Sequence, residues 1–133
     1  MYLIDSDQII NYLKGIPITV HLIQTFAPDG LAISAISHAE VIAGVYGATE
    51  PIRAEAGYRS FLQDVIILPF TGAIGEEYGR VRFDLKRRGL LIPVQDMLIA
   101  ATAIHYRLTL VTNNRKDFER ITNLTLSSSC AGR

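Results

Sequence analysis

Four acidic residues lie at the edges of apolar segments, where a role as surface charge explains them poorly: Asp5, Glu40, Asp96 and Asp117. Three of them stand where a predicted strand gives way to a helix or where a helix begins. In an open parallel sheet, the carboxyl ends of the strands form the edge at which ligands bind. Carboxylates that converge there repel one another unless a cation lies between them, and Mg²⁺ and Mn²⁺ prefer oxygen ligands. The pattern therefore indicates a divalent-cation site.

Each acid also has a purely structural interpretation. Asp5, Asp96 and Asp117 could each cap the helix that follows, because Asp is a favoured N-cap residue. The segment from Ser37 to Glu40 matches the capping box S-x-x-E, in which the Glu side chain accepts from the helix's own backbone. Capping does not predict that acids from four separate elements gather at one edge, and both interpretations stay open at this point.

Polar residues beside the first and the last acids are expected to orient the carboxylates or to add oxygen ligands. They are Ser6, Thr112, Asn113 and Asn114. Hydrogen bonds of this kind hold metal ligands in position and tune the metal.

Short apolar segments alternate with helical patterns along the whole chain. Strands are predicted at residues 2–4, 31–33, 65–68, 108–111 and 124–126, and helices at residues 9–13, 20–26, 37–46, 50–62, 71–88, 96–106 and 117–121. The alternation predicts a three-layer α/β sandwich, with a mostly parallel sheet of about five strands flanked by helices. Right-handed crossovers then bring the strand ends that lead into helices to one edge of the sheet.

Length and composition predict one enzyme-sized domain, residues 1–133, with 49% hydrophobic residues to bury. No apolar run approaches the roughly 18 residues of a membrane span, and the first residues lack the pattern of a signal peptide. The only cysteine, Cys130, excludes an intrachain disulfide. We expect a cytoplasmic protein that does not enter a membrane.

Charge is distributed unevenly although the formal net charge is zero. Residues 1–64 contain three basic and seven acidic residues, a net charge of −4, and residues 65–133 therefore carry +4. Much of that excess lies in one helical stretch, formed by Arg80, Arg82, Lys86, Arg87 and Arg88. The stretch could contact an RNA backbone or could simply be a solvated helix face.

Four segments, in this order and spacing, resemble the PIN-domain ribonucleases: IDSD at the first strand end, AEVIAG, PVQDMLIAATA and LVTNNRKDFERI. Within that family the chain is similar to the small VapC-type toxins of type II toxin–antitoxin pairs, from Met1 to about Ile121. The family's acidic site maps onto the four acids above, and its neighbouring hydroxyl residue onto Ser6. Asp7 departs from the small polar residue usual there, and the tail after about residue 121 departs from the family's usual ending.

The resemblance implies a PIN-like fold and a metal-dependent endoribonuclease that leaves a 5′-phosphate without a covalent intermediate. One or two Mg²⁺ or Mn²⁺ ions would activate water and clamp the phosphate. Asp5 and Asp96 are the expected direct ligands. Glu40 would bind the ion or orient the water, and Asp117 would hold a second ion or act through water.

The resemblance also implies an RNA substrate, an antitoxin that restrains the nuclease, and a homodimer. Apolar residues of the early helices could supply an interface: Ile9, Ile10, Leu13, Val41, Ile42 and Val45. Two rival interpretations stay open. One is a catalytically degenerate PIN fold that only binds RNA or protein, and the other is a Mg²⁺-binding receiver-like domain, although the late lysine of such a domain is missing.

Overall fold

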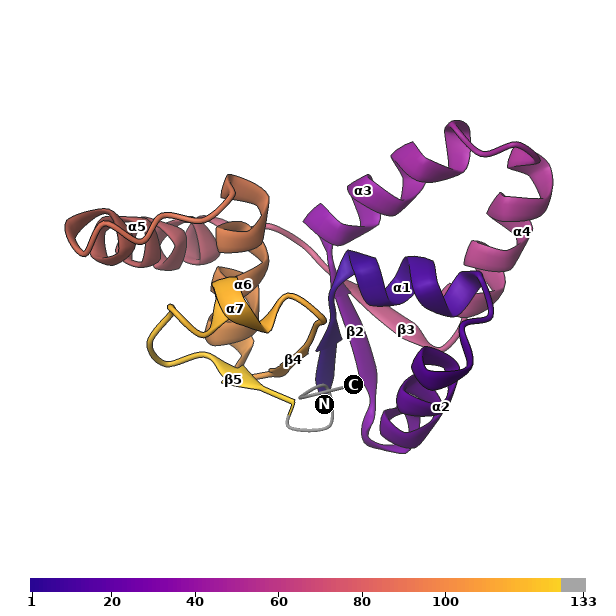
Figure 1. Ribbon diagram of the computed structural model, residues 1–133, viewed down its shortest axis with the longest axis horizontal. Helices are drawn as coiled ribbons and strands as arrows, with labels where there is room; N and C mark the ends of the chain where they lie inside the picture. Colours follow the sequence, from indigo (N-terminus) through magenta and orange to yellow (C-terminus); the bar gives the residue numbers. More distant parts are fainter. Residues whose placement is uncertain (128–133) are drawn as a thin grey trace.

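Five parallel strands form one sheet in the computed structural model, which describes residues 1–127. They are β1 (Tyr2–Ile4), β2 (Leu31–Ser34), β3 (Val65–Leu68), β4 (Thr109–Val111) and β5 (Thr125–Leu126). Their spatial order is β3-β2-β1-β4-β5, and every neighbouring pair runs parallel (Figure 1). The predicted α/β fold with a parallel five-stranded sheet is confirmed.

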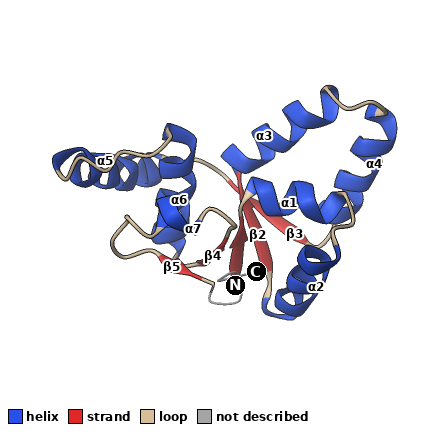
Figure 2. Ribbon diagram, in the orientation of Figure 1, coloured by secondary structure: helices blue, strands red, loops and turns tan. Residues whose placement is uncertain are grey.

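Helices cover both faces of this sheet (Figure 2). They are α1 (Ser6–Leu13), α2 (Pro17–Phe26), α3 (Ala35–Tyr46), α4 (Pro51–Leu62), α5 (Gly72–Arg87), α6 (Val94–Tyr106) and α7 (Arg115–Phe118), with a short 3-10 turn at Ala27–Asp29. One group, α1 to α4, packs on one face, and α5 to α7 pack on the other. The three layers follow from this arrangement.

The strands are mostly apolar because each sheet face has its own core. On β1, Leu3 packs against α5 and α6, whereas the next residue, Ile4, packs against α1 to α4. Ala32 and Ile33 of β2 alternate in the same way. Successive side chains of a strand point to opposite faces, so a sheet buried on both sides needs continuous apolar strands.

Five helices, α1, α2, α3, α6 and α7, begin two or three residues earlier than the sequence predicted, and the starts of α2 and α3 show the physical reasons. The helix predicted from residue 20 begins at Pro17, the first residue of α2, where a missing N–H costs nothing. Helix α3 begins at Ala35 rather than Ser37, because Oγ of Ser34 caps it by accepting from the backbone N of Ser37 at 2.9 Å.

The strand order reverses direction between β1 and β4. From β1 the chain moves outward through β2 to β3, then crosses back to place β4 on the other side of β1. Ligands bind in open α/β sheets at such a switch point, outside the carboxyl ends of the strands. Asp5 directly follows β1 and Thr112 directly follows β4. The order also differs from the 2-1-3-4-5 order of receiver-like folds, which contradicts that rival interpretation.

Within residues 1–127, no helix is both long and apolar enough to cross a membrane. Cys130 lies outside the described residues.

Candidate active site

Asp5 lies at the carboxyl end of β1 and is 4% exposed. As the N-cap of α1, its Oδ1 accepts a hydrogen bond from the backbone N of Ser6 at 2.8 Å. Its Oδ2 accepts a second one from Oγ1 of Thr112 at 2.7 Å. The capping interpretation is therefore confirmed for Asp5, yet capping uses only one carboxylate oxygen. The other oxygen ties together the loops that follow β1 and β4.

Glu40 lies in the second turn of α3, and its Oε1 accepts a hydrogen bond from Oγ of Ser6 at 2.9 Å. The capping box proposed from Ser37 to Glu40 is wrong, because α3 begins before Ser37 and Ser34 caps it. Glu40 instead faces the first residue of α1, the neighbour of Asp5. Ser6 thus holds a carboxylate of α3 beside the carboxylate that follows β1.

Asp96 and Asp117 come together through Asn114. The Nδ2 of Asn114 donates to Oδ2 of Asp117 at 3.1 Å and reaches Oδ2 of Asp96 at 3.4 Å. Neither acid is an N-cap, since α6 is capped at Pro93 and α7 at Asn114 itself. The capping interpretation is therefore wrong for both, and each carboxylate is directed into the acidic edge from the first turn of its helix.

The polar residues expected around the acids all contact the site or its supports. Oγ1 of Thr112, besides donating to Asp5, accepts from the backbone N of Asn114 at 3.0 Å. Oδ1 of Asn113 accepts from Nε2 of Gln8 at 2.9 Å. The loop after β4 is therefore tied both to the end of β1 and to helix α1.

Sequence reasoning missed two residues, Gln8 and Arg120. Gln8 is 2% exposed on α1 and joins it to the loop after β4. Arg120 follows α7, and its Nη2 lies 3.8 Å from Oδ1 of Asp117. A glutamine among the apolar residues of α1, and a basic residue three positions after an acid in a helical stretch, could have indicated both.

The environment of Asp5 disfavours its charged form. Burial is the main cause that raises the pKa of Asp5 from 3.8 to about 6. The hydrogen bonds from Thr112 and Ser6 act in the opposite direction and lower it, while the negative charges of Asp7 and Asp96 raise it further. The carboxylate is oriented by two donors, but no positively charged side chain within residues 1–127 offsets its burial.

The Asp96 carboxylate is repelled by three other acids. Burial raises the pKa of Asp96 to about 6, and the charges of Glu40, Asp117 and Asp7 raise it in that order. The bond from Asn114 lowers it. These three acids belong to α3, α7 and α1, so helices far apart in the sequence bring like charges together. Such clusters of perturbed carboxylates are typical of functional sites.

The possible ligand atoms at this edge suit a hard divalent cation, since they are carboxylate and hydroxyl oxygens. No group of three or more His, Cys, Asp or Glu side chains within residues 1–127 is close enough to hold an ion without rearrangement. Mg²⁺ usually keeps several waters and takes only one or two protein carboxylates. An ion at this edge would therefore be held by one or two carboxylates and by waters rather than by a closed cage of side chains, and the assignment of Asp5 and Asp96 as its ligands stays a prediction.

Intrahelical ion pairs neutralise much of the basic stretch on α5. Nη2 of Arg80 lies 2.7 Å from Glu77, and Arg87 and Arg88 lie 2.8 Å and 2.7 Å from Asp84. In the described part of the chain, Arg82 and Lys86 form no ion pair. Their charges remain available to a polyanion, so the basic surface on α5 is smaller than the sequence indicated.

A groove of about 700 Å³ lies between α1, α3 and α4, lined mostly by apolar side chains. Ile10, Leu13, Val41 and Val45, expected at an interface, line it. Ile9 is fully buried in the core beneath α1, so the expectation that it contributes to an interface is wrong.

Comparison with known proteins places this chain in a family. The PIN domain model matches residues 2–124. Ribonuclease VapC2 of Rickettsia felis is 39% identical over 98 residues, which cover 74% of this chain and 73% of that protein. Ribonuclease VapC1 of Haemophilus influenzae strain R2866 is 31% identical over 126 residues, which cover 93% and 94%. The crystal structure of VapBC2 from Rickettsia felis bound to a promoter DNA fragment superposes with a TM-score of 0.88 at 32% identity, covering 95% of this chain and 96% of that one.

Proposed function

The chain belongs to the PIN domain family, and we propose that it is a divalent-cation-dependent endoribonuclease, the toxin of a toxin–antitoxin pair, in one domain spanning residues 1–133 and acting in the cytoplasm. The observation that carries the proposal is the convergence of acids on Asp96. Its pKa is raised by burial and by carboxylates from three other helices. A fold that only binds RNA or protein has no need of such a repulsive arrangement.

Asp5 and Asp96 are the proposed ligands of Mg²⁺ or Mn²⁺. When bound, the ion supplies Lewis acidity, lowers the pKa of a water and offsets the charge of the scissile phosphate. The bonds from Ser6 and Thr112 fix both oxygens of Asp5, so its carboxylate is oriented before an ion arrives. Preorganisation of this kind avoids the cost of ordering the ligand during the reaction.

The other two acids are proposed to act beside these ligands. Glu40 is held by Oγ of Ser6 and would orient the attacking water or accept its proton. Asp117 is held by Asn114 and lies near Arg120, and it would take a second ion or act through a water. Water is the proposed nucleophile, so no covalent enzyme intermediate forms.

RNA is the proposed substrate, and Arg82 and Lys86 are its proposed contacts on α5. The other three basic residues of that stretch are paired with acids of the same helix. Two lysine or arginine charges supply affinity for phosphates without selecting a sequence.

An antitoxin is proposed to occupy the apolar groove between α1, α3 and α4 and to extend across the acidic edge. The support is position: Asp5 caps α1 and Glu40 lies on α3, so the groove and the carboxylates share two helices. A basic antitoxin side chain at the acidic edge would compete with the metal ion for its place among the carboxylates. Inhibition should then weaken when that basic residue is replaced, while binding through the groove persists.

A homodimer is proposed as the functional form. At the edge of the sheet, β3 presents Ile66 and Ile67, and Phe70 follows it, all three exposed. Natural proteins protect exposed apolar edge strands, and a second copy of the chain would do so here. Light scattering of the purified protein tests this: a monomer at micromolar concentration would contradict it.

The direct test of the nuclease proposal measures RNA cleavage with Mn²⁺ or Mg²⁺, with EDTA, and with substituted acids. Asp5→Asn or Asp96→Asn should reduce the rate by several orders of magnitude, and EDTA should abolish it. Asp64→Asn is the matched control, because Asp64 is exposed and precedes β3 at the opposite end of the strands. Wild-type cleavage by the Asp5→Asn protein would contradict Asp5 as a metal ligand and leave it only the role of capping α1.

A further inference from the structure

Arg120 connects one site acid to the chain segment that carries another. Its Nη2 lies 3.8 Å from Oδ1 of Asp117. Its Nη1 lies 3.4 Å from the carbonyl oxygens of both Leu90 and Leu91. These two residues belong to the segment between α5 and α6, which leads directly to Asp96 in the first turn of α6.

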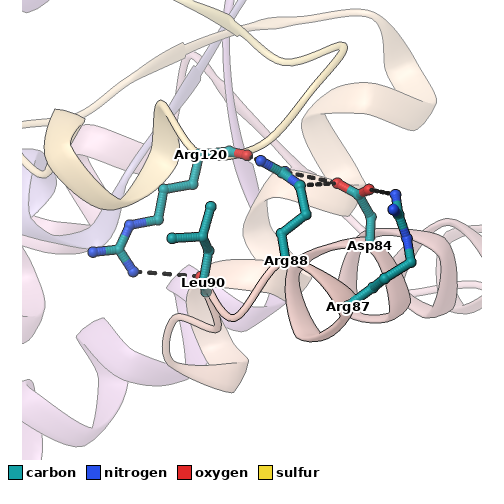
Figure 3. Close-up of polar contacts among 5 residues, drawn as sticks. All are labelled: Asp84, Arg87, Arg88, Leu90 and Arg120. Atoms are coloured by element: carbon teal, nitrogen blue, oxygen red, sulfur yellow. Dashed lines mark hydrogen bonds and ion pairs between the residues drawn. The ribbon is translucent and has the colours of Figure 1, made fainter.

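The backbone of Arg120 is anchored independently of its side chain. Its carbonyl oxygen accepts a hydrogen bond from Nη2 of Arg88 at 2.6 Å. Arg88 in turn is held by Oδ2 of Asp84, whose Oδ1 accepts from Arg87 (Figure 3). The carbonyl of Arg120 is thus pinned to the C-terminal end of α5, while its guanidinium reaches across to the segment that begins at Leu90.

Together these contacts join the acids of the site to the segment between α5 and α6. Asn114 bridges Asp96 and Asp117 from inside the site, and Arg120 bridges Asp117 and the Leu90–Leu91 backbone from outside. Resting on the proposed function, we propose that Arg120 is a positioning residue: it fixes Asp117 relative to the segment that carries Asp96, so that Asp117 stays beside this ligand and can take a second ion or act through a water.

A guanidinium suits this task better than an ammonium. Its planar fork presents several N–H donors at once, so one side chain can reach a carboxylate and two carbonyls. A lysine would supply the charge but could not occupy both sides of the bridge with the same geometry. Replacement by lysine therefore separates the effect of position from the effect of charge.

Charge and position predict opposite changes in metal affinity. A positive charge beside Asp117 repels a divalent ion. If Arg120 acted only by its charge, its replacement by a neutral residue would therefore tighten the binding of Mn²⁺. If Arg120 positions the carboxylates, its replacement would weaken the binding of Mn²⁺. A purely structural role would change thermal stability and leave the affinity of the folded protein unchanged.

Arg115, the first residue of α7, offers a matched control five residues before Arg120. Its Nη1 donates to the carbonyl of Ser127 at 2.6 Å, and its Nη2 lies 3.5 Å from Glu119. Its side chain is 25% exposed, against 29% for Arg120. Arg115 therefore makes the same kinds of contact, to a carbonyl and to a carboxylate, but within the described residues it touches none of the four site acids.

The experiment titrates Mn²⁺ into the purified full chain by calorimetry and measures RNA cleavage in parallel, with urea unfolding as a check of folding. Arg120→Gln should weaken Mn²⁺ binding about 10-fold and lower kcat about 10-fold, the range typical of residues that support metal ligands, with KM for RNA within about 2-fold. Arg120→Lys should fail to restore either quantity. Arg115→Gln should change neither.

Tighter or unchanged Mn²⁺ binding by Arg120→Gln, or full recovery by Arg120→Lys, would overturn the positioning role. If Arg120→Gln does not fold, Arg120→Lys decides alone, because it keeps the charge. Measurements on the wild-type protein distinguish a failure of the proposed function from a failure of the positioning role alone. Wild-type protein that neither binds Mn²⁺ nor cleaves RNA would refute the proposed function and this inference with it, whereas an active wild type with insensitive variants would refute the inference alone.

Discussion

Burial of the Asp5 carboxyl should make the metal-free protein less stable as the pH rises. The pKa of Asp5 is 3.8 in an unperturbed chain and about 6 in the fold, so the folded state binds the proton more tightly. Where the folded state holds more protons than the unfolded state, the free energy of unfolding falls with increasing pH. The loss begins near pH 4 and is complete above about pH 6.

The size of this effect follows from the two pKa values. Their separation corresponds to about 3 kcal/mol, since one pKa unit equals about 1.4 kcal/mol. Asn cannot ionise, so Asp5→Asn removes this dependence. About 0.5 kcal/mol of this is already lost at pH 4, so the difference in unfolding free energy between the variant and the wild type should shift by about 2.5 kcal/mol in favour of the variant between pH 4 and pH 7.5.

Urea unfolding followed by circular dichroism, at several pH values in EDTA, measures this difference directly. Any constant contribution from a changed hydrogen bond to Ser6 or Thr112 cancels, because only the change with pH is compared. Asp64→Asn, at an exposed position, should stay within about 0.5 kcal/mol of wild type throughout. Saturating Mn²⁺ should return stability to the wild type, since an ion among the carboxylates offsets their charge.

A difference between Asp5→Asn and wild type that stays constant from pH 4 to pH 7.5 would refute this reasoning. So would a wild type that gains stability relative to the variant as pH rises. Either result would mean that Asp5 is charged at little cost in the fold, and the electrostatic case for a cation at this edge would lose its main support.

Three further changes test other parts of the site. Asp96→Asn should raise the melting temperature of metal-free protein and shrink the rise that Mn²⁺ produces, because it relieves repulsion and removes a ligand; a scan that shows neither shift would contradict this. Thr112→Val removes a hydrogen bond that lowers the pKa of Asp5, so the acid limb of the kcat/KM profile should move to higher pH, and an unmoved limb would count against ionised Asp5 as the active form. Replacing Arg82 and Lys86 together by Ala should raise KM for RNA and reduce the dependence of log KM on log salt by about 1.4, whereas an unchanged slope would exclude both from RNA contact.

The sequence by itself determined the order and type of the elements. Periods of two and of about 3.6 residues locate strands and helices, and this local pattern placed β1 and β3 within their observed bounds. Right-handed crossovers then require the strand ends that lead into helices to share an edge, so the convergence of Asp5 with the loop after β4 was predictable. Boundaries failed where capping chemistry competed, as at Ser34 and Ser37.

Only the tertiary structure decided which atoms meet at that edge. The bond from Thr112 to Asp5 spans 107 residues, and the bond from Ser6 to Glu40 spans 34, so no local pattern contains them. The raised pKa of Asp5 also depends on burial by the whole fold, which a residue type alone does not reveal. Residue spacing specifies which side chains reach the edge because secondary structure is local. Whether they are paired, buried or repelled depends on neighbours that the folding of distant segments brings within hydrogen-bond reach.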